Sequence, residues 1–351
     1  MRKPTPLSVH KYLTEAYSKY YNSAFWMRDE GIMRERAQIL EESGVLAQDP
    51  LIEAVPQYPS EVSVSQACLE AGLSEETSAS LSKIVFGRST GIKLRQHQAQ
   101  SLRTAISGDA DGRFNVVVTS GTGSGKTESF LLPLLAALIE ERRNSSLISP
   151  INSWWNTKLS GTNKRWESMR YGQSSSVIHA MRAMILYPTN ALVEDQISRL
   201  RSAAMTAQKD YGNPLFYFGR YTGATLGGTF FPHADLGSDL RRRVNEVSAE
   251  IAKIVLETKN IRESMSAKGS DEQEILSACS QFQNPDCGEM LTRWDMIESP
   301  PDIMITNTSM LNIMLLRDTE KPIFEKTREW LAESSSNKFT LVVDELHSYR
   351  G

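Results

Sequence analysis

Hydrophobic positions in the first quarter of the chain recur at helical spacing. From His10 to Leu40, aromatic and aliphatic residues lie three or four positions apart, which predicts helix. Three prolines between residues 50 and 59 interrupt the pattern. A further helix is predicted over Leu73–Phe86, with Ser74 as its N-cap. We therefore expect a helical accessory domain over residues 1–90.

From residue 91 onward, the pattern changes to short apolar runs separated by helical segments. The runs are Phe114–Thr119, Ala183–Tyr187, Phe216–Tyr221, Asp302–Thr306 and Phe339–Val343. Such runs are typical of strands that are buried on both faces of a sheet. Strands that alternate with helices predict the α/β class with a parallel sheet, here over residues 91–351.

A polar stretch over residues 140–179 interrupts this alternation and predicts an irregular insertion. It contains Trp154, Trp155 and Trp166. Its cations are Lys158, Lys164, Arg165 and Arg170. Aromatic rings beside cations are used to bind single-stranded nucleic acid. Packing of the tryptophans on the core is the alternative, and we favour it.

Residues 232–299 predict a second insertion, which is mostly helical. Apolar residues at heptad-like steps from Leu240 to Ile261 predict one long helix with a packed seam. Arg241, Arg242 and Arg243 lie in its first turns, where a solvated face is favoured over a phosphate contact. Ser270 and Gln273 have capping-box spacing and predict a second helix that ends at Phe282.

Composition narrows the class of protein without identifying a ligand. The 351 residues are 40% hydrophobic and 23% charged, which excludes a disordered chain and points to about two domains. The net charge is −3, and it resides entirely in residues 1–90, so charge gives no evidence for a nucleic-acid partner. The three cysteines and the dispersed histidines lack metal-ligand spacing. With no signal peptide and no membrane-length apolar run, we expect a cytoplasmic protein without a membrane partner.

The strongest chemical signal is a glycine-rich loop between an expected strand and an expected helix. It reads Ser120-Gly121-Thr122-Gly123-Ser124-Gly125-Lys126-Thr127. The glycines allow backbone N–H groups to surround a phosphate, and the following helix N-terminus favours negative charge. Lys126 can then reach the terminal phosphates, and the Thr127 hydroxyl can hold Mg²⁺. This predicts an ATP site, although Ser120 replaces the first glycine of the strict motif.

A second motif follows the last expected strand and reads Asp344-Glu345-Leu346-His347. Asp344, at the carboxyl end of a buried strand, can hold Mg²⁺, and Glu345 can polarise an attacking water. An acidic pair alone is a common strand terminus. Downstream of a phosphate loop in the same α/β unit, it predicts a catalytic site.

Together these motifs resemble those of the superfamily 2 helicases of the DEAD/DEAH-box kind. Gly121–Thr127 resembles their motif I, and Asp344–His347 resembles motif II. Leu94–Gln98 resembles the upstream glutamine motif, in which the amide of Gln98 would read the adenine edge. The resemblance implies a first RecA-like lobe in which His347 couples nucleic-acid occupancy to the ATP site.

Three further segments resemble the family's nucleic-acid contacts, and they occur in the expected order. The residues concerned are Pro188, Thr189 and Asn190, then Thr222 and Gly223, and finally Thr306 and Asn307. Asn190 stands where many relatives carry Lys or Arg, which weakens one implied phosphate contact. Individually, each segment could be an ordinary strand-to-helix turn.

The ending from Asp344 to Gly351, with Arg293-Trp294-Asp295 and Pro300-Pro301-Asp302 upstream, narrows the resemblance. It is similar to the large bacterial Lhr-like and MrfA-like helicases, including members of phage-defence systems such as Druantia and DISARM. The resemblance implies ATP-dependent movement on nucleic acid, DNA rather than RNA, and a possible partner subunit of a defence system.

Motif II lies at the end of the chain, so we expect the second lobe, with its arginine finger, to be absent from it. Two alternatives stay open at this point. One is a P-loop NTPase of another class, and the other is a module that docks partners within a larger complex.

Overall fold

The computed structural model describes residues 5–51, 58–121, 123–143, 150–160, 165–173, 178–228, 230–232 and 237–349. Within these ranges, the side chains of residues 191, 192, 194 and 195 are not described. The chain forms two compact units, Met1–Tyr58 and Pro59–Gly351, which we call unit 1 and unit 2.

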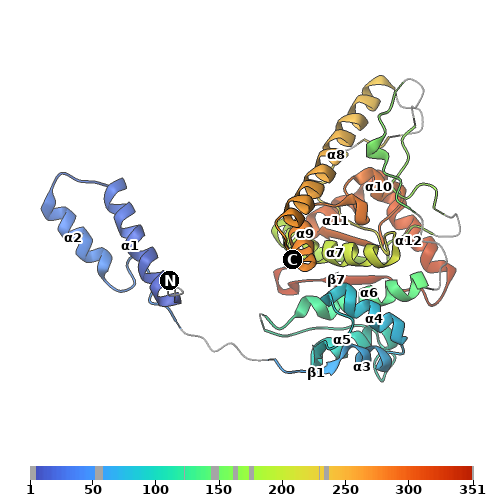
Figure 1. Ribbon diagram of the computed structural model, residues 1–351, viewed down its shortest axis with the longest axis horizontal. Helices are drawn as coiled ribbons and strands as arrows, with labels where there is room; N and C mark the ends of the chain where they lie inside the picture. Colours follow the sequence, from blue (N-terminus) through green and yellow to red (C-terminus); the bar gives the residue numbers. More distant parts are fainter. Residues whose placement is uncertain are drawn as a thin grey trace. The chain divides into compact units, whose positions relative to one another are not determined.

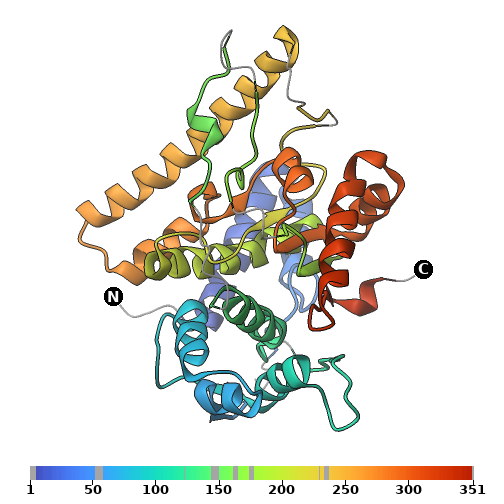
Figure 2. The ribbon, with the colours of Figure 1, turned by 90° about the vertical axis from the view of Figure 1, so that its right-hand side faces the viewer.

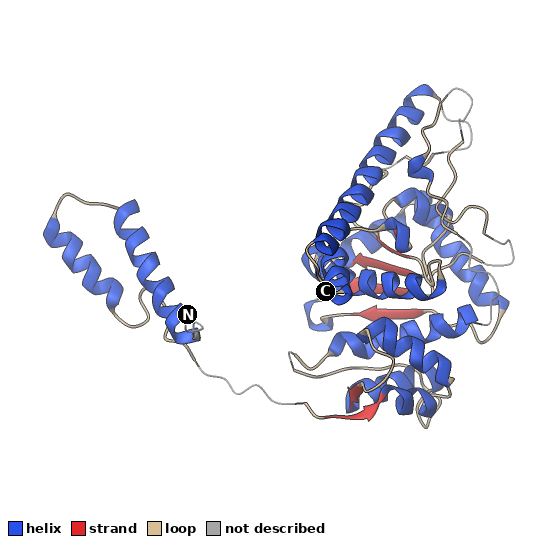
Figure 3. Ribbon diagram, viewed as in Figure 1, coloured by secondary structure: helices blue, strands red, loops and turns tan. Residues whose placement is uncertain are grey.

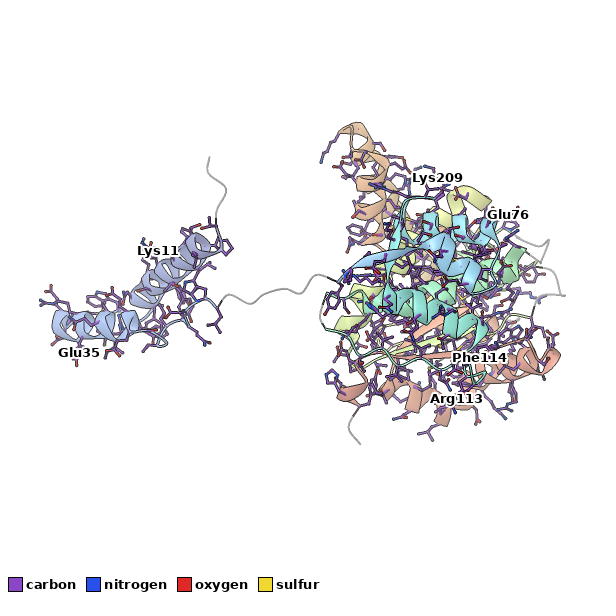
Figure 4. All side chains as sticks on the ribbon, turned by 90° about the horizontal axis from the view of Figure 1, so that it is seen from below. Lys11, Glu35, Glu76, Arg113, Phe114 and Lys209 are labelled. Atoms are coloured by element: carbon purple, nitrogen blue, oxygen red, sulfur yellow. The ribbon has the colours of Figure 1, made fainter. Side chains whose placement is uncertain are left out.

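Unit 1 is a pair of helices, α1 (Pro6–Ala24) and α2 (Glu30–Glu41), which carry the labelled Lys11 and Glu35 in Figure 4. Arg36 on α2 joins them by donating to the backbone oxygen of Phe25, at 2.6 Å, and to Asn22 Oδ1, at 3.0 Å. Neither helix has a buried residue among those described. The aromatic residues that predicted helix here are therefore largely exposed.

The boundary between the units lies 32 residues before the one expected from the sequence. Residues 59–90 form β1 (Ser60–Ser63), α3 (Val64–Glu70) and α4 (Glu75–Phe86), and the Ser74 side chain caps α4 as predicted. The apolar faces of α3 and α4 are buried in the same core as α5 (Gln96–Ser107) and α6 (Lys126–Arg143). A shared core makes these helices part of unit 2, although proline-rich sequence precedes them.

Unit 2 is built on five parallel strands in the order β5-β4-β6-β3-β7. The strands are β3 (Ala183–Tyr187), β4 (Phe218–Arg220), β5 (Glu289–Met290), β6 (Ile303–Asn307) and β7 (Thr340–Val343). A short antiparallel pair of β1 with β2 (Lys93–Arg95) lies apart from them. The predicted parallel α/β sheet is confirmed, and Figure 3 shows its strands between helices.

Successive residues of a strand point to opposite faces, so the central strands supply two cores. Ala183, Ile185 and Tyr187 of β3 pack in a core with α3 to α7, where α7 is Asn190–Tyr211. Met184 and Leu186 belong to a second core that contains Trp294. The second core lies under α10 (Arg293–Glu298), α11 (Thr308–Leu316) and α12 (Lys321–Glu333). Unit 2 also contains three 3-10 turns, η2 (Pro285–Cys287), η3 (Asp318–Glu320) and η4 (Leu346–Ser348), beside the elements of the two insertions described below.

The first insertion is irregular, as predicted, and its tryptophans pack on the second core. Trp154, Trp155 and Trp166 are 7%, 4% and 6% exposed, so their rings are not available for base stacking. Trp154 donates to both carboxylate oxygens of Asp295, at 3.2 Å each. That carboxylate also accepts from the backbone N–H of Met169 at 2.7 Å. The insertion is thus fixed to α10 by one buried acceptor.

The second insertion contains α8 (Ser238–Ala267) and α9 (Glu272–Ser280). Val244 and Ile251 of the predicted seam are buried against the Trp154–Asn156 turn, η1. The capping box that begins α9 is Asp271 with Glu274, one position later than predicted. Ser270 is unavailable because its backbone N–H closes the end of α8 on Met265.

Asp302, just before β6, is fully buried among three arginines. Its Oδ1 lies 3.1 Å from Arg142, 3.7 Å from Arg170 and 3.6 Å from Arg182. Oδ2 accepts from the backbone N–H of Tyr217 at 2.7 Å. Burial alone would raise the pKa of Asp302, but the three guanidinium groups outweigh burial and hold it well below its usual range. This carboxylate joins α6, the first insertion and the sheet.

His179, beside this cluster, should make stability depend on pH. Burial, reinforced by the charge of Arg170, lowers the pKa of His179 from 6.5 to about 3. The unfolded chain therefore binds a proton that the folded chain does not between these two pH values, so stability should fall as the pH decreases from 6.5. The loss is limited to about 1.4 kcal/mol per pH unit. We therefore expect the free energy of unfolding in urea to fall less between pH 7 and pH 5 for His179→Gln than for the unsubstituted chain. The control His10→Gln, in unit 1, should show the same fall as the unsubstituted chain.

Among the described helices, none is both long and apolar enough to cross a membrane.

Candidate nucleotide and nucleic-acid site

The glycine-rich loop leads directly into α6, which begins at Lys126. Gly123 and Gly125 have φ of 74° and 76°, a left-handed backbone that favours glycine. Ser124 is buried between them, and its hydroxyl lies 2.5 Å from that of Ser120. Gly121 is exposed, and Thr122 lies outside the described residues. The turn therefore presents the first turn of an 18-residue helix, with Lys126 and Thr127 in it, as an anion-binding end.

Residues 114–119 precede this loop and are not part of the sheet, in contrast to the strand predicted there. Phe114 is 39% exposed and Val117 is 81% exposed. Lys338, just before β7, lies over the Phe114 ring at 3.3 Å, and Figure 4 shows Phe114 beside Arg113. An apolar run shows that a segment can be buried, but a strand also requires backbone hydrogen bonds to a neighbouring strand. Residues 114–119 form no such ladder with the described strands.

Gln98 lies against the loop and contacts it through its side-chain amide. Its Oε1 accepts from the backbone N–H of Arg95 at 3.0 Å, and its Nε2 donates to the carbonyl of Gly125 at 3.1 Å. A Cβ on Gly125 would lie 2.4 Å from that Nε2, so only glycine permits this approach. Arg95 adds a contact that the sequence reasoning missed, from its Nη1 to the carbonyl of Gly123 at 2.7 Å. The sequence indicates this contact only through the position of Arg95, three residues before Gln98.

The carboxylate motif follows β7 and lies near the loop lysine. Burial raises the pKa of Asp344 above its usual value, and the backbone N–H of Glu345 and the charge of Lys126 partly offset this rise. A second cation beside Asp344 would lower its pKa further, which is the electrostatic condition for a Mg²⁺ ligand. The oxygens of Asp344 and Thr127 are of the hard type that Mg²⁺ prefers, so these residues fit that ion.

Glu345 adopts a left-handed conformation with φ of 49°, alone among the described non-glycine residues. Such a conformation costs on the order of 1–3 kcal/mol and is often found at functional positions. The backbone N–H of Glu345 donates to Asp344 Oδ1 at 3.0 Å, and its Oε2 lies 3.3 Å from His347 Nδ1. The His347 side chain is 76% exposed. The strained turn therefore places both carboxylates directly after the end of β7.

The expected nucleic-acid residues gather at the carboxyl edge of the same sheet, but they differ in accessibility. Thr189 and Asn190 follow β3 and are exposed, Pro188 and Asn307 are half-buried, and Gly223 is exposed. Asn307 Nδ2 donates to Asn190 Oδ1 at 2.7 Å, which joins two of the three segments. Carboxyl edges of parallel strands are where ligands bind in open α/β sheets.

Thr222 and Thr306 do not present their side chains at this edge. They are 1% and 0% exposed, respectively. The Thr306 hydroxyl donates to the carbonyl of Tyr221 at 2.7 Å, and the Thr222 carbonyl accepts from Arg293 at 2.9 Å. Both threonines stabilise the ends of neighbouring strands. At these two segments, the residues next to Thr222 and Thr306 would have to make any contact with a ligand.

Comparison with known proteins matches part of the chain to a family model. The matched residues are 95–216, which include Gln98, the phosphate loop and β3. They match the DEAD/DEAH box helicase family. The resemblance predicted from the motifs, and with it the RecA-like fold class, is thereby confirmed. The helicase match ends before the carboxylate motif, whose place beside Lys126 rests on the structure.

One curated relative matches over almost the whole chain. The chain is 30% identical over 374 residues to Druantia protein DruE of Escherichia coli (strain UMEA 4076-1). The alignment covers 97% of this chain and 18% of that protein, so the chain spans about a fifth of its length. No solved structure gives a significant match.

Proposed function

We propose that this chain is the ATP-binding lobe of a nucleic-acid-dependent helicase or translocase, with DNA as the nucleic acid. The observation that carries the proposal is the convergence at one sheet edge. The phosphate loop, Gln98 and Asp344 meet there, and exposed Asn190 and half-buried Asn307 follow on the neighbouring strand ends. A nucleotide site and a polymer site on adjacent strand ends are what ATP-driven movement on nucleic acid requires.

Each residue at the nucleotide end has a role in this proposal. Lys126 stabilises the charge of the terminal phosphates, and Gln98 holds the loop and reads the base. Thr127 and Asp344 would hold Mg²⁺, which would supply positive charge beside the phosphates when bound. Glu345 orients the attacking water. An arginine finger from a second lobe would raise the rate by about 10³–10⁵, so we expect slow hydrolysis when no such lobe is docked.

The similarity to a Druantia protein supports a role in phage defence, beside partner subunits. The test is ATP hydrolysis by the whole protein with and without single-stranded DNA or RNA. Stimulation by DNA supports the proposal, and equal stimulation by RNA would reassign the polymer. A rate that no nucleic acid changes would contradict it and would favour a P-loop NTPase of another class.

A further inference from the structure

A cavity of about 730 Å³ lies between the Trp154–Asn156 turn and the first turns of α8. Its lining includes Trp155, Lys158, Arg241 and Arg242. The volume is within the range of about 300–1,000 Å³ that is common for ligand sites. Figures 1 and 2 show this turn and the adjacent end of α8 at one end of unit 2, with α5 and α6 at the opposite end. The cavity is therefore separate from the phosphate loop.

The lining is rich in hydrogen-bond donors that the described residues leave without acceptors. Trp155 is 4% exposed, and its indole Nε1 has no hydrogen-bond partner. Arg241 Nε is likewise buried and without a partner. Buried donors normally have acceptors, and the described residues offer none to these two N–H groups, so the wall of the cavity keeps donor capacity that the described residues do not use. The ammonium group of exposed Lys158 adds a third donor.

The backbone adds to the positive character of this cavity. α8 is 30 residues long, and its N-cap, Gly237, provides no side-chain cap for the first N–H groups. Glu246 is the carboxylate in the lining, and it lies 3.8 Å from Arg242. Asp239, in the first turn, lies 4.0 Å from the same guanidinium. With Arg242 facing both acids, Lys158 and Arg241 remain to attract an anion.

The two walls of the cavity are fixed to each other by hydrogen bonds. Asn245 on α8 accepts from the backbone N–H of Leu159 at 2.9 Å and donates to its carbonyl at 3.0 Å. Ser248 donates to the carbonyl of Trp155 at 2.7 Å. Because the walls are already joined, a ligand would not have to order them on binding, and less affinity would be lost to entropy.

We propose that this cavity binds a phosphodiester group of the nucleic-acid strand on which the protein acts. This inference rests on the proposed function and adds a second contact region to it. Phosphate oxygens are acceptors only and carry charge, which matches a lining of unpaired N–H donors and cations. The buried tryptophan rings exclude base stacking here, so the contact should be independent of sequence.

The test is binding of a fluorescein-labelled single-stranded oligothymidylate to the full chain, by anisotropy, at about 50–200 mM salt. The variant Lys158→Gln/Arg241→Gln removes two cations from the cavity. We expect the slope of log K against log salt to decrease in magnitude by about 1.4, or about 0.7 per lost contact, and the affinity to fall on the order of tenfold. The control Lys253→Gln/Lys259→Gln removes two exposed cations from the same helix and should leave the slope unchanged.

The outcomes separate this inference from the function on which it rests. Normal binding and an unchanged slope in the Lys158/Arg241 variant would overturn the cavity assignment and leave the helicase proposal standing. No binding of DNA or RNA by the unsubstituted chain would overturn both. Polyglutamate of the same total charge serves as a competitor. If it displaced the oligonucleotide from the unsubstituted chain but did not bind the Lys158/Arg241 variant, the cavity would be assigned to an acidic protein segment instead of a phosphodiester. Circular dichroism of both double variants verifies that they fold.

Discussion

Replacement of Asp302 by alanine is expected to lower the free energy of unfolding of unit 2 by about 3–5 kcal/mol. The carboxylate is fully buried and compensates Arg142, Arg170 and Arg182. Without it, three guanidinium groups would repel one another in a medium of low polarity. Its loss would also leave the backbone N–H of Tyr217 without its acceptor. Urea denaturation followed by tryptophan fluorescence measures the change.

Two further variants identify charge as the cause. Asp302→Asn keeps the volume and an acceptor, so a loss as large as that of alanine assigns the effect to charge. Addition of Arg170→Met to Asp302→Ala should recover part of the stability, because it removes one of the uncompensated cations. Asp111→Ala, at an exposed ion pair, is the control and should change stability by less than about 1 kcal/mol. A comparable loss in that control would contradict this account.

Substitution at the proposed ATP site should separate nucleotide binding from hydrolysis. Lys126→Ala removes the cation in the first turn of α6, and we expect hydrolysis to fall by about 10²–10³ with weaker nucleotide binding. Glu345→Gln keeps the shape of the side chain but cannot act as a base. It should therefore retain nucleotide binding while hydrolysis falls by about 10²–10⁴. Calorimetric titration with ATP and a phosphate-release assay on the whole protein measure the two effects.

Lys209→Ala, at an exposed lysine on α7, provides the matched control and should leave both quantities unchanged. If Glu345→Gln hydrolysed ATP at the normal rate, another residue would have to orient the water. If Lys126→Ala bound and hydrolysed ATP normally, the nucleotide site would have to lie elsewhere.

The sequence predicted best where local chemistry and burial agree. β3 is found at its expected residues, and the bounds of β6 differ from the expected ones by one residue. Continuous apolar runs between turn residues are typical of strands that are buried on both faces of a parallel sheet. The Ser74 cap is also as expected, because its hydroxyl needs only the backbone three residues ahead. At the site, Gln98 and Asp344 could be expected near the phosphate loop because the segments that carry them resemble the motifs of the helicase family.

Prediction failed where the outcome depends on partners that are distant in sequence. Apolar spacing in residues 114–119 cannot show whether a neighbouring strand accepts them. Thr222, shortly after β4, and Thr306, within β6, have the residue type of a ligand contact, yet tertiary packing buries them. Nothing local marks Asp302 as the partner of Arg142, which lies 160 positions earlier in the chain. Ser270 and Asp271 are both good caps, and the end of the preceding helix decides between them.

The position of β7 at the end of the strand order has a dynamic consequence for the carboxylates that follow it. Within the described residues, β7 pairs with β3 alone, and Leu341 is 54% exposed. A strand held by one ladder can open locally at less cost than the whole unit unfolds. Amide hydrogens near Asp344 should thus exchange with solvent by fluctuations that leave β3 and β6 intact. Asp344 and Glu345 would then be the least rigid part of the proposed nucleotide site, and bound ligand would slow exchange there first.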